Sequence, residues 1–373
     1  MKIAKIKGIE IKLHFSTFLI IALVGFYAAG FYASLVPKAS IIELITVGLI
    51  NGIIMLASIL IHELSHSIIA QRNGLDVKEI ELYLFGGVSK IEEEPRTPKS
   101  EFLIAVVGPL SSILIGVSLL VASYLPMSIP IFLLVTFLYA GISNIGLGIF
   151  NLIPAFPTDG GRVLRAFLWN RRKNIVSATK TAVKIGVGFG YGLMIYGFFQ
   201  MFTFGLINGI WLILMGSFLS STARKSYLQT VNQVALSNIN VKEMLYISNL
   251  RIPFEMLISD AVREYFIPYK KSYFPVTQGG EIKGIVHIAD IKKIPQHQRS
   301  SYIIGYIMRK ISEFPLVNEE QSGKEVLKKL SRSDDNPHIV IVKEKASNNL
   351  LGFIGEEDLI SYLKFWNLSV ESS

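Results

Sequence analysis

The second apolar segment of the chain, residues 41–70, is long enough to cross a bilayer, yet its last third contains the motif His62-Glu63-Leu64-Ser65-His66. On an α-helix, residues four apart lie on one face about one turn from each other, so His62 and His66 can bind one metal ion. Ionisable side chains inside a membrane helix are costly and usually mark a functional site. We therefore expect a membrane helix that carries half of a metal site. A structural pair of hydrogen-bonded histidines is the alternative.

The composition predicts a polytopic membrane protein with a polar part attached. Of the 373 residues, 51% are hydrophobic and 17% are charged, and the mean hydropathy is +0.46. A chain of this composition is too apolar to fold as one soluble globular domain. The chain has no cysteine, which excludes disulfides and thiolate ligands, so a metal must be held by histidine and carboxylate. The net charge of +9 comes from basic residues spread between apolar segments, which predicts helix orientation in a bilayer and no nucleic-acid partner.

About six apolar segments have the length of membrane-spanning helices. They cover residues 14–36, 41–70, 102–124, 131–152, 183–201 and 204–219. Two shorter stretches, 2–13 and 77–94, alternate apolar and polar residues around glycines and predict β-hairpins. The second hairpin either offers an unpaired edge on which an extended substrate adds as a strand, or simply connects two helices.

A second polar stretch follows the fourth apolar segment. Residues 151–162, NLIPAFPTDGGR, cannot form a regular helix, because two prolines and a glycine pair interrupt them. Asp159 is the one acidic residue there, and it suits the third ligand of a site that keeps an open position for water. Alternatively, Asp159 caps the helix that begins at Gly160. Asn151 can donate a hydrogen bond to an oxyanion or a substrate carbonyl, or it can be a buried amide that holds the loop.

Basic residues alternate between the two sides of the predicted helices. Four lysines precede the first apolar segment, and the loops after the second and fourth segments hold Arg72, Lys78, Lys90, Arg96 and Lys99, then Arg162, Arg165, Arg171, Arg172 and Lys173. The loop after the first segment holds one basic residue, and the loops after the third and fifth segments hold none. By the positive-inside rule, both termini face the cytoplasm, as do the metal-bearing ends of the second and fourth segments. The predicted location is thus a cell membrane, crossed several times.

From about Arg224 the sequence changes to that of an α/β domain built from two similar units. Residues 274–290 of the first unit align with residues 339–358 of the second, each reading as a strand pair followed by a helix. A repeat of this kind indicates a duplicated unit that buries its core against its twin. The predicted domains are a transmembrane domain over 1–222, a linker over 223–240 and a C-terminal domain over 241–373, with repeats at 241–296 and 304–366.

These motifs resemble those of the site-2 protease family of intramembrane zinc metalloproteases, in the subgroup with a C-terminal tandem CBS domain. The histidine motif matches the family's first motif, and residues 151–162 look like its second. The resemblance implies that His62, His66 and Asp159 bind one zinc ion, that Glu63 is the catalytic base, and that Asn151 contacts the substrate. Family members cut the transmembrane segments of other membrane proteins.

The C-terminal half resembles CBS pairs, which commonly bind adenine nucleotides. The family's Gly-x-x-Ser/Thr-x-x-Asp pattern is only half kept, because His287 and Gly355 stand at the hydroxyl positions. Asp290 and Asp358 remain and could hold a ribose. The alternative is a structural role, or a homodimer formed through the CBS domains.

The sequence thus predicts an intramembrane zinc metalloendopeptidase, with a cytoplasmic CBS pair that regulates it. Membrane-spanning proteins are its expected substrates, and the lipid bilayer is its surroundings. Two other classes remain open. Two histidines and a carboxylate also form the facial triad of non-haem iron enzymes. The second alternative class is a zinc carrier that is gated by the CBS pair. A carrier needs ligands spaced along a path across the membrane, whereas the predicted spans show one ligand cluster near one face.

Overall fold

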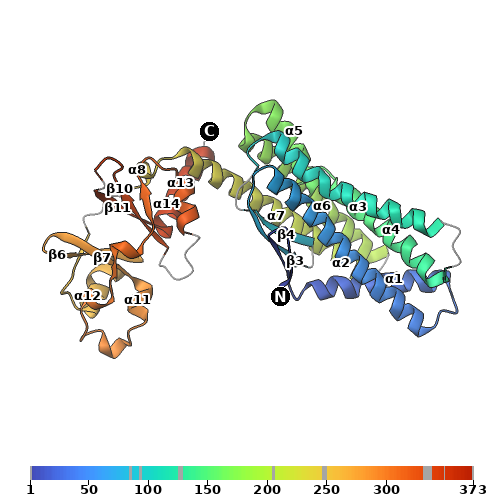
Figure 1. The fold of residues 1–373 in the computed structure, drawn as a ribbon, viewed down its shortest axis with the longest axis horizontal. Coiled ribbons are helices and arrows are strands. Elements are labelled where there is room, and N and C mark those ends of the chain that lie inside the picture. Colours follow the sequence, from blue (N-terminus) through green and yellow to red (C-terminus); the bar gives the residue numbers. More distant parts are fainter. Residues whose placement is uncertain are drawn as a thin grey trace. The chain divides into compact units, whose positions relative to one another are not determined.

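The computed structural model describes residues 2–83, 86–91, 95–124, 129–203, 206–245, 250–330, 338–347 and 349–371. By contacts, the chain divides into two compact units, Met1–Leu228 and Gln229–Ser373. The first unit is mostly helical and the second mixes helices and strands (Figure 1).

The first unit is a bundle of long helices with an apolar exterior. Five described helices are long and apolar enough to cross a membrane, namely α1 (Thr17–Leu35), α2 (Ile41–Arg72), α3 (Pro98–Tyr124), α4 (Ile131–Asn151) and α6 (Ile175–Thr203). Helix α7 (Leu206–Asn238) contains residues 206–219 of the sixth predicted span, whose first two residues lie outside the described part of the chain. The shorter α5 (Asp159–Arg172) follows α4. Phe26, Leu114 and Phe202 are each more than two-thirds exposed, as expected for side chains that face lipid. The prediction of a polytopic helical membrane protein is confirmed.

Close contacts between glycines bring these helices together. A Cβ atom added to Gly25 of α1 would lie 2.8 Å from the carbonyl oxygen of Gly48 of α2, and the same holds for α3 and α4, where Gly116 faces the carbonyl of Gly141 at 2.7 Å. Without side chains at these positions the backbones approach closely, which is how membrane helices gain packing energy when lipid offers no hydrophobic driving force. The α1–α2 and α3–α4 pairs are therefore tightly packed.

The two predicted hairpins form one sheet. Strands β1 (Lys2–Ile6) and β2 (Ile9–Leu13) pair antiparallel, as do β3 (Val77–Tyr83) and β4 (Gly86–Ile91). The hairpins are joined by parallel pairing of β2 with β3, which gives the order β1-β2-β3-β4. The apolar face of this sheet packs on α2 and α3 through Ile9, Ile80 and Leu82. β4 is the edge strand next to α2.

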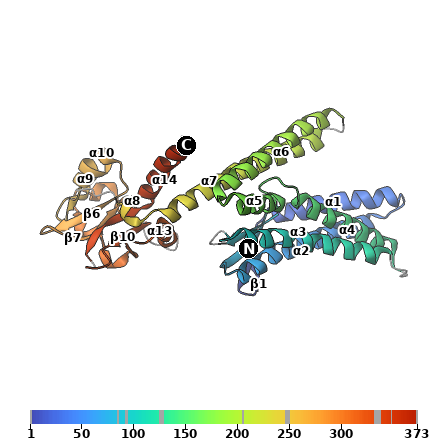
Figure 2. The ribbon, with the colours of Figure 1, turned by 90° about the horizontal axis from the view of Figure 1, so that it is seen from above.

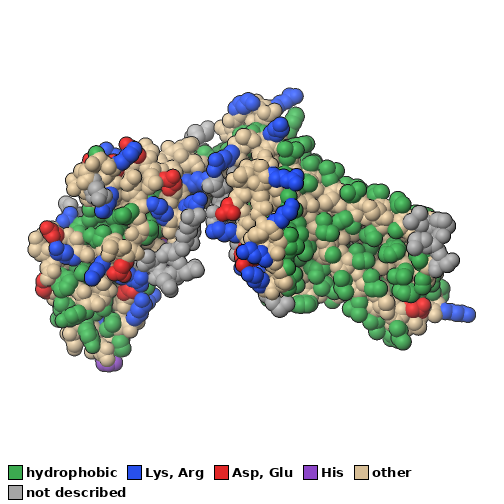
Figure 3. All heavy atoms as spheres, viewed as in Figure 1, with side chains coloured by type: hydrophobic (Ala, Val, Ile, Leu, Met, Phe, Trp, Pro, Cys, Tyr) green, Lys and Arg blue, Asp and Glu red, His purple; other side chains and the backbone are tan. Residues whose placement is uncertain are grey.

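Charge is concentrated at one end of this unit. On the face shown in Figure 3, hydrophobic side chains cover the flank of the helices, and lysines and arginines gather at the end that carries α5 and the sheet. A view turned by 90° shows α5 at the same end as β1 (Figure 2). The predicted clusters of basic residues therefore share one end of the bundle.

The segment expected to be a linker, residues 223–240, continues α7 as a helix up to Asn238. The boundary between the two units, at Leu228 and Gln229, falls inside it. Toward the end of this helix Leu236 is buried together with Ile239 in a core that also contains Val326 and Val340. The last turns of α7 thus belong to the C-terminal unit.

The C-terminal unit contains two sheets, in the orders β5-β6-β7-β8 and β11-β10-β9. Its strands are β5 (Ile252–Pro253), β6 (Tyr273–Gln278), β7 (Glu281–His287), β8 (Arg309–Lys310), β9 (Leu316–Asn318), β10 (Ile339–Lys343) and β11 (Leu350–Gly355). Its α-helices are α8 (Val241–Met244), α9 (Ile258–Ala261), α10 (Ile267–Tyr269), α11 (Ile288–Lys292), α12 (Ile304–Ile307), α13 (Gly323–Leu330) and α14 (Glu356–Glu371).

Both repeats contain an antiparallel strand pair followed by a helix, β6-β7-α11 in the first and β10-β11-α14 in the second. One buried cluster contains Tyr273 and Ile285 of the first repeat together with Ile339 and Ile341 of the second. The two repeats therefore share a core. The predicted fold class, a helical membrane part followed by an α/β tandem domain, is confirmed.

Candidate metal centre

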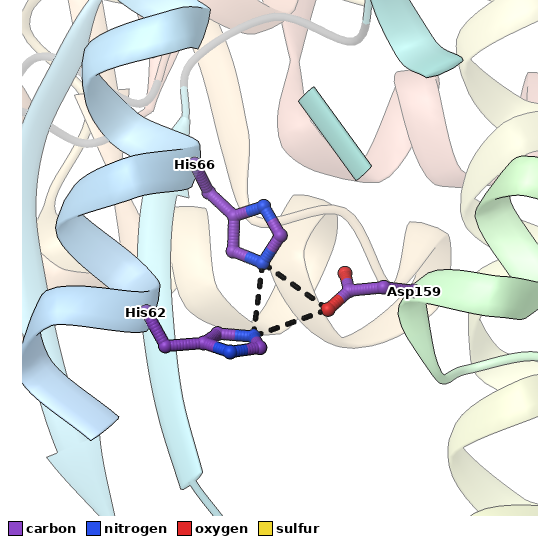
Figure 4. A group of neighbouring side chains, drawn as sticks. All are labelled: His62, His66 and Asp159. Atoms are coloured by element: carbon purple, nitrogen blue, oxygen red, sulfur yellow. Dashed lines mark hydrogen bonds and ion pairs between the residues drawn. The ribbon is translucent and has the colours of Figure 1, made fainter. Parts of the chain in front are cut away.

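Three ligand side chains meet where α2, α3 and α5 converge. His62 and His66 project from one face of α2, and Asp159 reaches them from the start of α5 (Figure 4). The side chains are nearly buried, with 5%, 5% and 9% of their residue surface exposed. The structure thus brings together the two motifs that lie almost one hundred residues apart in the chain.

The loop before α5 aims Asp159 at the histidines. Thr158 is the N-cap of α5, since its side-chain oxygen accepts a hydrogen bond from the amide of Gly161. Asp159 is the first helical residue, so its side chain does not serve as the N-cap, and that alternative is wrong. A Cβ atom on Gly160 would lie 2.2 Å from the carbonyl oxygen of Leu152. The glycine pair is therefore required for the tight turn that places the carboxylate.

The distances between the ligand atoms suit a small tetrahedral ion. Nε2 of His62 lies 3.1 Å from Nε2 of His66, and Oδ2 of Asp159 lies 3.2 Å and 3.1 Å from these two nitrogens. Around zinc, with ligand bonds of about 2.0–2.1 Å, tetrahedral geometry separates ligand atoms by about 3.3–3.4 Å. Two histidines and one carboxylate are also a ligand set of catalytic zinc sites that keep an open position. The residues present fit one zinc ion.

Helix α3 orients both imidazole rings from behind. Nδ1 of His66 donates a hydrogen bond to the backbone carbonyl of Ile104 at 2.6 Å. Because a carbonyl only accepts, Nδ1 of His66 carries a proton, so in the neutral ring that binds a metal the lone pair is on Nε2, which faces the other two ligand atoms. Nδ1 of His62 is 2.9 Å from the hydroxyl of Ser112. Such outer hydrogen bonds fix ring orientation and raise metal affinity.

Gly108 allows α3 to approach the histidines this closely. A Cβ atom there would lie 2.2 Å from Nε2 of His66 and 2.7 Å from Nε2 of His62. The sequence alone does not indicate a role for Gly108 or Ser112. The Gly108-Pro109 pair was the available signal, since both residues weaken a membrane helix, but it does not indicate which neighbour the glycine faces.

Arg162 lies next to the carboxylate from the other side. Its Nη1 atom is 3.7 Å from Oδ1 of Asp159. Because Oδ2 faces the histidines, the two carboxylate oxygens have different partners. This arrangement favours binding of a metal through a single oxygen of Asp159.

Glu63 and Asn151 do not belong to the ligand cluster. The three-residue ligand group contains only His62, His66 and Asp159 among the residues that the structure describes. Glu63 follows His62 on α2 and its side chain lies against β4, because a Cβ atom on Gly87 would be 2.3 Å from its Cγ. Asn151 is the last residue of α4 and is partly exposed. The roles of these two residues stay predictions.

The two CBS carboxylates have different surroundings. Arg309 donates hydrogen bonds to both oxygens of Asp290, and Lys293 binds one of them. Burial would raise the pKa of Asp290, but these cations hold it below its usual value. Asp358 uses Oδ2 to accept hydrogen bonds from Tyr273 and the amide of Gly355, while its Oδ1 lies 3.9 Å from Lys271.

His287 takes over one task of the hydroxyl residue that is missing from the first repeat. Its Nδ1 atom accepts a hydrogen bond from the amide of Ala289 at 3.0 Å and caps α11. A serine or threonine hydroxyl commonly makes this contact at a helix N-terminus. The departure from the CBS pattern at this position therefore leaves the helix capped.

Comparisons with known proteins agree with both halves of the chain. The sequence model of Peptidase family M50 matches residues 51–129 and 126–195 of this chain. The sequence model of the CBS domain matches residues 304–364. The chain is 27% identical to zinc metalloprotease MJ0392 of Methanocaldococcus jannaschii, over 100% of this chain and 98% of that protein. It is also 27% identical to stage IV sporulation protein FB of Bacillus subtilis, over 49% of this chain and 62% of that protein.

Among solved structures, a site-2 protease from Methanocaldococcus jannaschii is 32% identical to this chain. The match covers 60% of this chain and 94% of that one, with a TM-score of 0.44. The two ranges matched by the M50 sequence model contain the histidine motif and Asp159, respectively. With both motifs inside the matched ranges and meeting in one buried cluster, this chain belongs to peptidase family M50, the site-2 protease family of intramembrane zinc metalloproteases, and carries a C-terminal CBS domain.

Proposed function

We propose that His62, His66 and Asp159 hold a single zinc ion, and that the chain hydrolyses peptide bonds within or near the transmembrane segments of other membrane proteins. The observation that carries this proposal is the triangle of ligand atoms, with edges of 3.1–3.2 Å, buried in a membrane bundle. Zinc, when bound, supplies a Lewis acid that lowers the pKa of water and polarises a carbonyl.

Glu63 is the base in this proposal. It accepts a proton from the attacking water, the water oxygen adds to the scissile carbonyl carbon, and the C–N bond breaks as Glu63 passes the proton to the leaving nitrogen. Asn151 donates a hydrogen bond to the substrate carbonyl as negative charge develops on its oxygen. Among the described residues there is one ligand cluster of this kind, which supports a hydrolytic site over a carrier with ligands along a path.

The substrate must be extended at the cut, because a helix hides its amides. β4 supports binding of such a segment, since it is one of the two edge strands of its sheet and its Gly87 lies against Glu63. An extended substrate that adds to β4 by main-chain hydrogen bonds would lie beside the base. Substrates are therefore expected to carry residues that weaken a helix near the cleavage site.

We also propose that the CBS pair binds a regulatory nucleotide next to Asp358. A pocket there is lined by Arg251, Lys271, Tyr273, Phe353 and Asp358, among others. Two cations suit phosphate groups, aromatic rings suit an adenine base, and Oδ1 of Asp358 can accept from a ribose hydroxyl. Asp290 is less suited, because Arg309 binds both of its oxygens. Formation of a homodimer through the CBS domains stays a prediction.

Replacing Glu63 by glutamine tests the catalytic assignment. Glu63→Gln should keep zinc, since the residue is not a ligand, but should cut about 10²–10⁴-fold more slowly because glutamine cannot accept the proton. Cleavage is followed by immunoblot after co-expression with candidate single-span membrane proteins, and zinc is measured by mass spectrometry. Ser65→Ala, in the same motif but bonded back to the carbonyl of Ile61, is the control that should cut normally. Wild-type cleavage by Glu63→Gln would refute the assignment.

Gly108→Ala tests the close approach of α3 to the ligands. The added methyl group would overlap both Nε2 atoms, so the rings must turn and zinc affinity should fall about tenfold or more. The dissociation constant is measured by competition with a chelator. Gly146→Ala on α4, where a Cβ atom meets nothing within 4 Å, should bind zinc like the wild type. Equal affinities for both variants would show that the helices can move apart.

The absence of cysteine allows the orientation to be tested with single cysteines. Lys38 follows α1 and Lys173 follows α5, and both are exposed. If the metal-bearing end is cytoplasmic, Lys38→Cys should react with a membrane-impermeant maleimide on intact cells, whereas Lys173→Cys should react only after lysis. The reverse pattern would invert the predicted topology.

Titration calorimetry of the full chain with ATP and AMP tests the nucleotide site. We expect binding that Lys271→Ala weakens about tenfold or more, because a phosphate loses a cation. Lys292→Ala, exposed on α11 and not among the pocket residues, is the matched control. Equal binding by both variants would place the nucleotide elsewhere, and no heat of binding would favour the structural role.

A further inference from the structure

Helices α3 and α5 are joined by an ion pair that is shielded from solvent. Glu101 lies in the first turn of α3 and is 0% exposed, and Arg165 on α5 is 4% exposed. Nε of Arg165 donates a hydrogen bond to Oε1 of Glu101 at 2.6 Å, and Nη2 of the same guanidinium contacts that oxygen as well. The pair thus connects the helix that orients the histidines to the helix that carries Asp159.

Stability alone does not explain this pair. Removing two charges from water often costs more than their attraction returns, so apolar residues of similar volume are frequently as stabilising. The cost is raised here because Oε2 of Glu101 is buried and has no hydrogen-bond partner among the described residues. A shift of either helix would, however, leave one buried charge uncompensated, and this penalty favours the arrangement in which Glu101 and Arg165 meet.

Arg165 also contacts the loop that leads to Asp159. Its guanidinium lies over the ring of Phe156 at 5.2 Å from the ring centroid. Phe156 is buried among residues of α6 and α7, and a Cβ atom on Gly186 of α6 would lie 1.9 Å from its carbonyl oxygen. One side chain therefore fixes both the loop before Asp159 and the helix after it.

We propose that Glu101 and Arg165 are positioning residues that set the distance of the Asp159 carboxylate from His62 and His66. This inference rests on the proposed zinc site. Arg165 lies six residues, or about 9 Å along the helix axis, after Asp159. A sliding of α5 on α3 would therefore carry Oδ2 of Asp159 away from the two Nε2 atoms, which it now faces at 3.1–3.2 Å.

The test removes both charges together, in a Glu101→Leu/Arg165→Met double variant of the full chain, so that no charge is left unpaired. Two quantities are measured: the zinc dissociation constant, by competition with a chelator, and the unfolding temperature of the metal-free protein. We expect zinc to bind about tenfold more weakly or worse, as for the loss of outer-shell support, with little change in unfolding temperature. Arg172→Met, an exposed arginine of the same helix, is the control and should bind zinc normally.

Zinc affinity within twofold of the wild type would overturn the inference, and so would a lower unfolding temperature with unchanged zinc affinity, since that is the signature of a merely structural pair. If the double variant does not fold, Glu101→Gln/Arg165→Gln, which also removes both charges but keeps polar side chains at both positions, is held to the same two outcomes. His62→Ala separates this inference from the proposed site. If His62→Ala binds zinc as the wild type does, the metal site is wrong; if it loses zinc while the Glu101 variants keep it, only the positioning role is wrong.

Discussion

The site depends on the close packing of α3 between α2 and α5. Gly108 allows the backbone of α3 to reach the imidazoles, and the carbonyl of Ile104 and the hydroxyl of Ser112 then hold both rings. Farther toward its start, the same helix binds α5 through Glu101. Because a polar group buried away from water is costly unless it finds a partner in the protein, these contacts leave little freedom in how the three helices are arranged.

The bilayer explains why the polar residues are where they are. Residues 152–158 are not helical, and backbone of this kind is tolerated at membrane depth only where protein covers it. Here Ala155 and Phe156 are buried, and Gly186 brings α6 directly against the carbonyl of Phe156. The loop that delivers the carboxylate is thus covered by a helix that contributes no ligand. The apolar side chains that face outward separate this polar interior from lipid.

The C-terminal unit shows how local partners decide whether a motif residue is available. Asp290 and Asp358 hold equivalent positions in the two repeats, so sequence alone treats them alike. In the structure, Arg309 from β8 binds both oxygens of Asp290, whereas Asp358 keeps one oxygen toward the cationic side of a pocket. The pairing of β7 with β8 brings Arg309 next to the first repeat, and no local pattern around Asp290 indicates this.

The sequence by itself determined the membrane helices, the histidine pair and the acidic residue of the broken stretch, because each follows from apolar length, helical periodicity or the breaking of a helix by proline and glycine. Only the tertiary structure decided that β2 pairs with β3 to join two hairpins into one sheet, and that Gly108, Ser112 and the Glu101–Arg165 pair support the ligands. These features join residues tens of positions apart. A pattern along the chain records which residues can share a face of a helix, but the partner that each face meets is fixed only when the helices pack.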